Sequence, residues 1–312
     1  MIKAGLIERK NRKRFSGDED EFNTPKIIVE KEEATSAVIA AFDKFKPKTK
    51  QEAQEIFDEL NKQYPDDVDQ SNWWDSASQV AFRNFFIWGH DHDFGFGILR
   101  KGAMSTRHLE ITSEAMSLGF LPKSLEGKKV LDVGMWTGGD LIILVGLGGS
   151  CLALEESPMP AKAAKLLTKR LNIDAEILTS SVYQYKEEWK QSFDYIYCSG
   201  VLYHVTDPLL FLRILFCYLS VDGELFIETK AAPGKEGFCS YSGVLEKGWN
   251  WYAPDELTLG RWFVDAGFHA KDVTIYRRDN GRLLGHATKK STAKMVETAG
   301  FSRPDSWLEK EC

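Results

Sequence analysis

The feature that most constrains the fold is an apolar run that breaks into glycines, Val130-Leu-Asp-Val-Gly-Met-Trp-Thr-Gly-Gly139. Residues 130–133 are typical of a buried central strand of a parallel sheet. Gly134, Gly138 and Gly139 allow a sharp turn and a close approach to a ligand, where a Cβ would collide. The segment therefore predicts a strand, a glycine loop and a helix, the unit with which doubly wound sheets hold ligands.

A second predicted strand, at 150–154, leads to Glu155, a carboxylate placed to accept hydrogen bonds from ribose hydroxyls. No G-x-x-x-x-G-K-[ST] sequence is present, so a P-loop is disfavoured. The dinucleotide pattern G-x-G-x-x-G would need glycine at Trp136. An adenosine ligand without a pyrophosphate is favoured. Glu156 is a neighbouring alternative for the ribose contact, and a plain tight turn is the alternative reading of the loop.

A later set of motifs adds a family resemblance. GVLYH at 200–204, Asp207-Pro208-Leu209, the strand-like 223–229 and Asn250-Trp-Tyr-Ala-Pro254 follow the LDVG of 131–134. Over residues 98–280 the chain resembles the S-adenosylmethionine-dependent class I methyltransferases. It is most similar to the branch that contains the bacterial tRNA wobble-uridine carboxymethyltransferase. The resemblance implies S-adenosylmethionine as cofactor and methyl transfer as the reaction.

The expected fold is α/β, a doubly wound, seven-stranded Rossmann-like methyltransferase sheet with a helical, aromatic-rich N-terminal cap. Strands are predicted at 129–133, 150–154, 175–178, 193–198, 223–229 and 271–277, and helices at 34–45, 49–64, 138–147, 160–171, 207–219 and 254–266. Asp207-Pro208 is predicted to cap the helix that follows. The predicted domains are a cap over 1–105, a methyltransferase domain over 106–285 and an unassigned extension over 286–312.

The cap contains a dense aromatic group, whose role is either to wall an active site or to form ordinary core beneath the sheet. Its members are Trp73, Trp74, Phe82, Phe85, Phe86, Trp88, Phe94 and Phe96. Both interpretations remain open at this level.

The resemblance assigns donor-binding roles to residues at the ends of the predicted strands. Asp132 is expected to order the loop and the methionine ammonium, with a helix N-cap as its alternative role. Trp136 is placed to contact the sulfonium by cation–π attraction or to close the loop as a packed side chain. The full predicted cofactor set is Asp132, Gly134, Trp136, Gly138, Glu155, Ser181, Val182 and Ser199.

His204 and Tyr203 are the predicted catalytic residues, because they follow Gly200 where open α/β sheets place ligand contacts. A histidine there can act as a general base near neutral pH, and its alternative role is to hold the loop. The predicted substrate residues are His90, His92, Arg100, Trp251 and Tyr252. No metal site is predicted, since adjacent ligands on a short loop seldom converge on one ion.

The donor is inferred from departures of this sequence from the pattern of the related branch, and the acceptor is inferred from the net charge of the chain. The related branch holds a carboxylated donor with a lysine, the tyrosine of GVLYH and a distant arginine; Lys101 and Tyr203 match two of these, and the arginine cannot be placed. Ordinary S-adenosylmethionine is therefore expected. The net charge of −6 gives no overall footprint for nucleic acid.

The predicted function is methyl transfer to a small-molecule acceptor, such as a carboxylate- or amino-acid-like metabolite, on O, N or S. The alternatives are a tRNA wobble-uridine modifying enzyme and a non-catalytic protein that binds an adenosine ligand. We expect no membrane segment, since the chain has no apolar run near eighteen residues. The scattered cysteines, which show no C-x-x-C spacing, favour a cytoplasmic location. A homo-oligomer is also expected.

Overall fold

The computed structural model describes residues 22–23, 25–67, 86–234, 237–243 and 250–291. A seven-stranded sheet forms its centre, in the order β10-β11-β7-β6-β3-β4-β5. All strands run parallel except β11, which is antiparallel to both of its neighbours. The bounds are β3 Lys129–Val133, β4 Ser150–Glu155, β5 Ala175–Thr179, β6 Phe193–Ser199, β7 Leu219–Lys230, β10 Val273–Arg278 and β11 Arg282–Thr288. The predicted α/β, doubly wound seven-stranded fold is confirmed.

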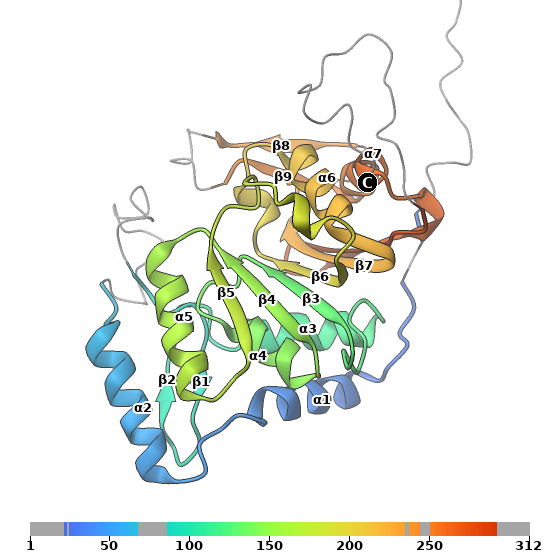
Figure 1. The fold of residues 1–312 in the computed structure, drawn as a ribbon. Coiled ribbons are helices and arrows are strands. Elements are labelled where there is room, and N and C mark those ends of the chain that lie inside the picture. The colour runs from blue at the N-terminus through green and yellow to red at the C-terminus, as the bar shows by residue number, and fades with distance from the viewer. Residues whose placement is uncertain (1–21, 24, 68–85, 235–236, 244–249, 292–312) are drawn as a thin grey trace, which may run out of the picture.

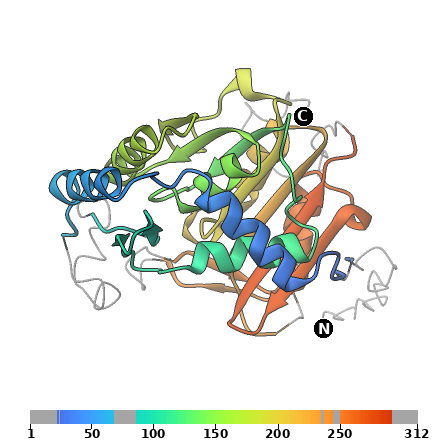
Figure 2. The same cartoon turned by 90° about the horizontal axis from the view of Figure 1, so that it is seen from below.

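Two helical layers cover the two faces of this sheet (Figure 1). Val130, Tyr195 and Tyr197 face the layer of α1, α3 and α4, whereas Leu131, Val133 and Ile196 face α6 and α7, as strand alternation requires. Figure 2 shows α1 lying against α3 across the first face. The helices are α1 Lys31–Asp43, α2 Lys50–Gln63, α3 Arg107–Ser117, α4 Gly139–Gly146, α5 Pro158–Arg170, α6 Pro208–Tyr218 and α7 Glu256–Ala266.

Short elements complete the fold. A two-residue pair joins β1 His92–Asp93 to β2 Leu99–Arg100, and a hairpin joins β8 Cys239–Tyr241 to β9 Tyr252–Pro254. Single 3-10 turns form η3 Glu187–Trp189, η4 Leu202–His204 and η6 Ala270–Asp272. In the described ranges, no helix has the length and apolar character needed to cross a bilayer.

Three elements differ from the sequence expectation. Helix α3 was not predicted, although its Ile111, Ala115 and Met116 are buried. Strand β11 was not predicted either, because its glycine and alanine have low intrinsic strand propensity; between two strands, however, Gly285 lets Phe263 of α7 pack closely. Strand β7 begins at Leu219, before the predicted start of this strand at residue 223.

The backbone around Asp222 makes an irregularity inside β7. Asp222 has a φ of +64° and donates its N–H to the Lys289 carbonyl at 2.7 Å, while the β6–β7 register shifts between Phe193 and Tyr195. The antiparallel strand of the sheet is β11. This strand includes residue 285, at which the predicted methyltransferase domain was expected to end. The domain limits stay a prediction.

Part of the N-terminal aromatic group lies outside the described residues: Trp73, Trp74, Phe82 and Phe85. Of the described members, Phe86, Trp88 and Phe94 are buried in the core beside α1 and α2, while Phe96 is exposed. Trp88 is held at its backbone and at its side chain. Its backbone N–H donates to Asp66 Oδ1 at 2.9 Å, and its indole N–H donates to the Tyr64 carbonyl at 2.9 Å. These three side chains therefore form core.

Candidate active site

The glycine loop between β3 and α4 is the centre of the site. Gly134 and Gly138 have φ values of +76° and +87°, and Trp136 between them has a φ of +50°. A Cβ on Gly134 would collide with Val201 of the turn after β6. Gly134 is thus required for conformation and for close packing, because L side chains rarely adopt this φ and no space is left for one.

Glu155 ties the end of β4 to this loop. One carboxylate oxygen accepts the Trp136 N–H at 3.0 Å, and the other accepts the Ser157 N–H at 2.8 Å. The residue is buried, and burial raises the pKa of its carboxyl to about 7 in spite of these two hydrogen bonds. Glu156 points to solvent as an exposed residue. The carboxylate at the loop is therefore that of Glu155.

Asp132 lies beneath the loop with no partner for one oxygen. Its side chain is 1% exposed, and Oδ2 makes no hydrogen bond within the described structure. Burial, together with the nearby acids Asp140 and Glu155, raises the pKa of its carboxyl well above the ordinary value. The alternative role as helix N-cap is wrong, because the N-cap of α4 is Gly138. A buried carboxylate without a hydrogen-bond donor or a cation is costly, so this geometry favours a cationic ligand.

Asp140, in the first turn of α4, is a second buried acid on the same face. It accepts the Tyr197 hydroxyl at 3.0 Å, and Tyr197 lies opposite Asp132 in the β3–β6 register. Burial raises the pKa of Asp140 to about 7, although the Tyr197 hydrogen bond acts in the other direction. Neither Asp140 nor Tyr197 was predicted as a site residue, since their meeting depends on which strand lies beside β3.

The turn after β6 carries the predicted catalytic pair. Ser199 ends β6, Gly200 adopts a φ of +74°, and Tyr203 and His204 follow in η4, both half-buried. Their rings lie 4.0 Å apart between centroids. Asp207 ends the turn, because its Oδ1 accepts the Leu210 N–H at 3.0 Å and caps α6, as predicted.

An ion pair that was not predicted from the sequence supports the turn after β6. The Arg282 guanidinium binds the Glu228 carboxylate through two nitrogens and lies 4.6 Å from the Tyr203 ring centroid. Glu228 is fully buried and also accepts the Gly200 N–H at 3.0 Å. Burial opposes the charge of Arg282, but Glu228 keeps the pKa of the guanidinium above its ordinary value.

Trp251 and Tyr252 lie near the same turn, on the β8–β9 hairpin. The Trp251 N–H donates to the Tyr203 carbonyl at 2.8 Å. The ring of Tyr241 of β8 lies tilted at 5.3 Å from the Tyr252 ring and 6.4 Å from the Trp251 ring, and Tyr241 is 60% exposed. The structure thus brings Trp251 and Tyr252, two of the predicted substrate residues, beside the predicted catalytic residue Tyr203.

Ser181 and Val182 follow β5, the strand next to β4. The Ser181 hydroxyl accepts the Tyr183 N–H at 3.3 Å, and Val182 is buried. They lie at the same edge of the sheet as Glu155, since β4 and β5 run parallel and both end there.

The N-terminal candidates separate into two groups. His90 contacts the loop: its Nδ1 accepts the Gly139 N–H at 3.3 Å, and its ring is 5.8 Å from that of Trp136. His92 instead packs against Phe42 and Trp88, with both ring nitrogens buried. Arg100 pairs with Asp66 at 2.7 Å and stacks on Trp88.

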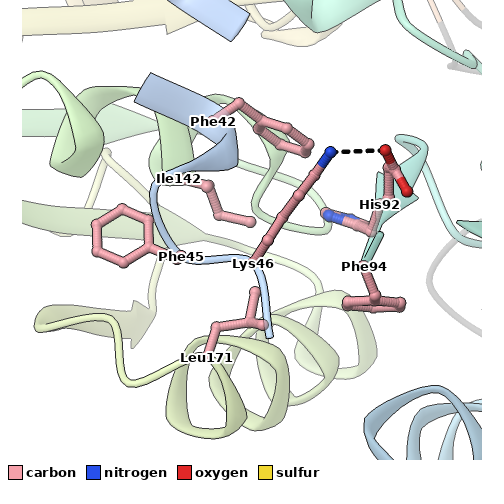
Figure 3. Close-up of a pocket in the computed structure, with 8 residues that line it drawn as sticks. Phe42, Phe45, Lys46, His92, Phe94, Ile142 and Leu171 are labelled. Atoms are coloured by element: carbon pink, nitrogen blue, oxygen red, sulfur yellow. Dashed lines mark hydrogen bonds and ion pairs between the residues drawn. The ribbon is translucent and has the colours of Figure 1, made fainter. Parts of the chain in front are cut away.

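His92 also lines a small apolar hollow between the cap and the sheet layer (Figure 3). Lys46 crosses it to bind Asp93 at 2.6 Å. The lining residues are Phe42, Phe45, Lys46, His92, Asp93, Phe94, Ile142 and Leu171.

The electrostatics of the site favour a cationic ligand. Burial lowers the pKa of His90 to about 4 and that of His108 well below its ordinary value, so these imidazoles are neutral. Within the described ranges, no group of three or more His, Cys, Asp and Glu side chains is arranged to hold a metal ion.

Comparison with known proteins gives a consistent result. A family described as "Methyltransferase domain" matches residues 107–302. A tRNA U34 carboxymethyltransferase of Hydrogenovibrio crunogenus is 31% identical over 158 residues, which cover 46% of each chain. A ubiquinone biosynthesis O-methyltransferase of Xanthomonas euvesicatoria is 30% identical over 162 residues, 48% of this chain and 66% of the relative. The chain thus spans about half to two thirds of the length of these curated relatives.

Among the solved structures to which this chain is similar is a 1,6-didemethyltoxoflavin-N1-methyltransferase of Burkholderia thailandensis. It is 20% identical to this chain, with a TM-score of 0.43 over 53% of this chain and 72% of the other.

Proposed function

Because the matched region covers more than half of its length, the chain belongs to the methyltransferase-domain family, and we propose that it transfers a methyl group from S-adenosylmethionine to a small-molecule acceptor. The predicted enzyme class agrees with the family. The observation that carries the proposed donor is the pair formed by the glycine loop and Glu155, which the Trp136 N–H joins at 3.0 Å.

In this proposal the donor lies along the carboxyl edge of β3, β4 and β5. Glu155 accepts the ribose hydroxyls, and the methionine part of the donor lies beside the loop that contains Gly134 and Gly138. Ser181 and Val182, after β5, contact the adenine. The residues fit this group, because Asp132 has a buried oxygen without a partner in the described structure and the donor supplies a cationic amino group.

The acceptor is proposed to lie at Tyr203 and His204, between the turn after β6 and the β8–β9 hairpin. When bound, the sulfonium donor supplies an electrophilic methyl group. His204 then takes a proton from an acceptor that carries one, and Tyr203 orients the acceptor beside Trp251 and Tyr252. His90 supports the loop from behind, whereas His92 and Arg100 have structural partners and are the weaker substrate candidates.

The ion pairs of Lys46 and the net charge of the chain favour a small acceptor over RNA. Lys46 lies in the basic run 44–50, but it binds Asp43 and Asp93. The net charge of the chain is −6, which opposes a polyanion.

A carboxylated donor is the second candidate, and one observation favours it. Arg282 lies over Tyr203 and is an arginine distant in sequence from GVLYH, as in the related branch. Glu228 engages this guanidinium through two nitrogens, which leaves less of its charge for a ligand carboxylate. We therefore place ordinary S-adenosylmethionine first.

Calorimetric titration with S-adenosylmethionine and S-adenosylhomocysteine tests the proposal, with Glu155→Ala and Glu156→Ala as a matched pair. Each lost hydrogen bond to a charged carboxylate costs about 1.5–3 kcal/mol, so Glu155→Ala is expected to weaken binding by about 10-fold or more. Glu156→Ala is expected to bind as the wild type does. A loss at Glu156 alone would move the ribose contact to that residue, and no binding of either ligand would refute the proposed donor.

A further inference from the structure

Two buried acids lie under the glycine loop without a basic side chain between them. Asp132 is 1% exposed and Asp140 6%, and no ion pair in the described structure reaches either of them. Only Asp140 has a side-chain donor, the Tyr197 hydroxyl at 3.0 Å. The Oδ2 atom of Asp132 has no partner there.

Two carboxylates so placed do not both ionise in a low-dielectric interior, because neither water nor a cation compensates the second charge. Such a pair takes up a proton and titrates as one unit. The direction of the pKa change agrees, since burial raises the pKa of both carboxyls. Repulsion from Asp140 and Glu155 adds to the rise at Asp132, and repulsion from Glu228 adds to the rise at Asp140.

No neighbouring charge removes the need for that proton. The histidines behind the loop are neutral at pH 7, and the guanidinium of Arg282 is bound to Glu228. The groups that face the pair from the surrounding elements are Cys151 and Glu155 on β4, Tyr197 and Cys198 on β6, Glu228 on β7, and His90 and His108 on the cap side.

We propose that Asp132 and Asp140 share a proton in the ligand-free protein and release it to solvent when the amino group of S-adenosylmethionine binds beside them. This inference rests on the proposed function and adds to it a second donor-positioning residue, Asp140. The incoming ammonium replaces the proton as the positive charge, so both carboxylates ionise in the complex. The Tyr197 hydroxyl stabilises the ionised form of Asp140.

The proton exchange is measurable on the full-length wild-type protein. Calorimetry at pH 6.5 in phosphate, PIPES and imidazole buffers gives the number of protons from the dependence of the apparent enthalpy on the buffer ionisation enthalpy. Three probes separate the groups: S-adenosylmethionine, S-adenosylhomocysteine and 5′-methylthioadenosine, the last of which keeps the adenosine but has no amino group.

We expect the first two ligands to release up to about one proton more than methylthioadenosine does. Any proton that Glu155 loses to the ribose contributes equally to all three and cancels. Affinity for S-adenosylhomocysteine should rise with pH between 5.5 and 7.5, by at most about tenfold per unit. Equal proton release with methylthioadenosine, or none with any ligand that binds, would overturn the inference. Failure of all three ligands to bind would instead refute the proposed function.

Variants give an independent readout. Asp140→Asn keeps an acceptor for the Tyr197 hydroxyl and removes one charge, so Asp132 ionises at lower pH and the extra proton release should fall. The exposed Asp222→Asn, whose parent carboxylate binds Lys290 at 3.1 Å on the surface, is the matched control and should release as many protons as the wild type. Unchanged release in a folded Asp140→Asn protein would exclude Asp140 from the pair.

Discussion

The backbone N–H of Trp136 donates to Oε2 of Glu155 at 3.0 Å, so the glycine loop after β3 and the end of β4 are held as one unit. The same carboxylate also accepts the Ser157 N–H at the start of α5. A displacement of the loop therefore also moves the carboxylate of Glu155, which is proposed to bind the ribose, even when residue 155 itself is not substituted.

Gly134→Ala tests this coupling, with Gly127→Ala as its control. Both glycines have a similar φ, +76° and +73°, but only at Gly134 does a Cβ meet another side chain, that of Val201. Both substitutions should cost about 1–2 kcal/mol of folding free energy from the backbone conformation. Only Gly134→Ala should also weaken S-adenosylmethionine binding, by more than about tenfold, or roughly 1.4 kcal/mol. Urea unfolding and calorimetry measure the two effects, and equal donor affinity in the two variants would contradict the coupling.

His204→Asn tests the proposed general base. With an acceptor from a metabolite screen, kcat should fall by about 10²–10⁴-fold, because the proton of the acceptor loses its base. The donor dissociation constant should stay unchanged, as His204 is not proposed to contact the donor. His269→Asn, at an exposed histidine, serves as the matched control. A variant that keeps wild-type turnover would assign His204 a structural role.

Arg282→Met should destabilise the protein by about 3–5 kcal/mol, because it leaves the fully buried Glu228 charged and without its partner. The double variant Arg282→Met with Glu228→Gln should be more stable than the single one, since the uncompensated charge is then absent. Urea unfolding of both proteins gives the comparison. Simple additivity of the two substitutions would show that the ion pair does not act as a unit.

His92 makes stability depend on pH. Burial lowers its pKa to about 3, so below pH 6.5 the unfolded chain takes up a proton that the folded protein does not, and stability falls as the pH falls. The loss from this one group at pH 5 is about 2 kcal/mol. His92→Phe removes this contribution and keeps an aromatic ring in the packing against Phe42 and Trp88.

Urea unfolding at pH 7.5, 6 and 5 should therefore show a smaller loss of stability for His92→Phe than for the wild type. Donor binding at pH 7.5 should be equal in the two proteins, because His92 packs in the cap. An identical pH dependence would show that the imidazole is protonated in the folded state, and loss of acceptor turnover alone would return His92 to the substrate site.

Local sequence determined much of the fold, because the signals act within one element. The apolar run before Gly134, the glycines of the loop and the Asp207-Pro208 cap each specify their own backbone conformation. Helices α1, α2, α4, α5, α6 and α7 and six of the seven strands accordingly lie close to where their periodicity predicts them. The position of Glu155 at the end of β4 follows from the same local pattern.

Tertiary structure decided the rest, because it depends on which strands become neighbours. Strand β11 has a sequence of weak propensity and forms only since β7 and β10 offer ladders on both sides. Its insertion between these strands brings Arg282 onto the ring of Tyr203. The two residues lie far apart along the chain, so the sequence does not predict this contact. The pairing of β3 with β6 likewise places Tyr197 opposite Asp132 and beneath Asp140. A sequence identifies the separate acids, but only the packed sheet excludes water from them and so makes them compete for a proton.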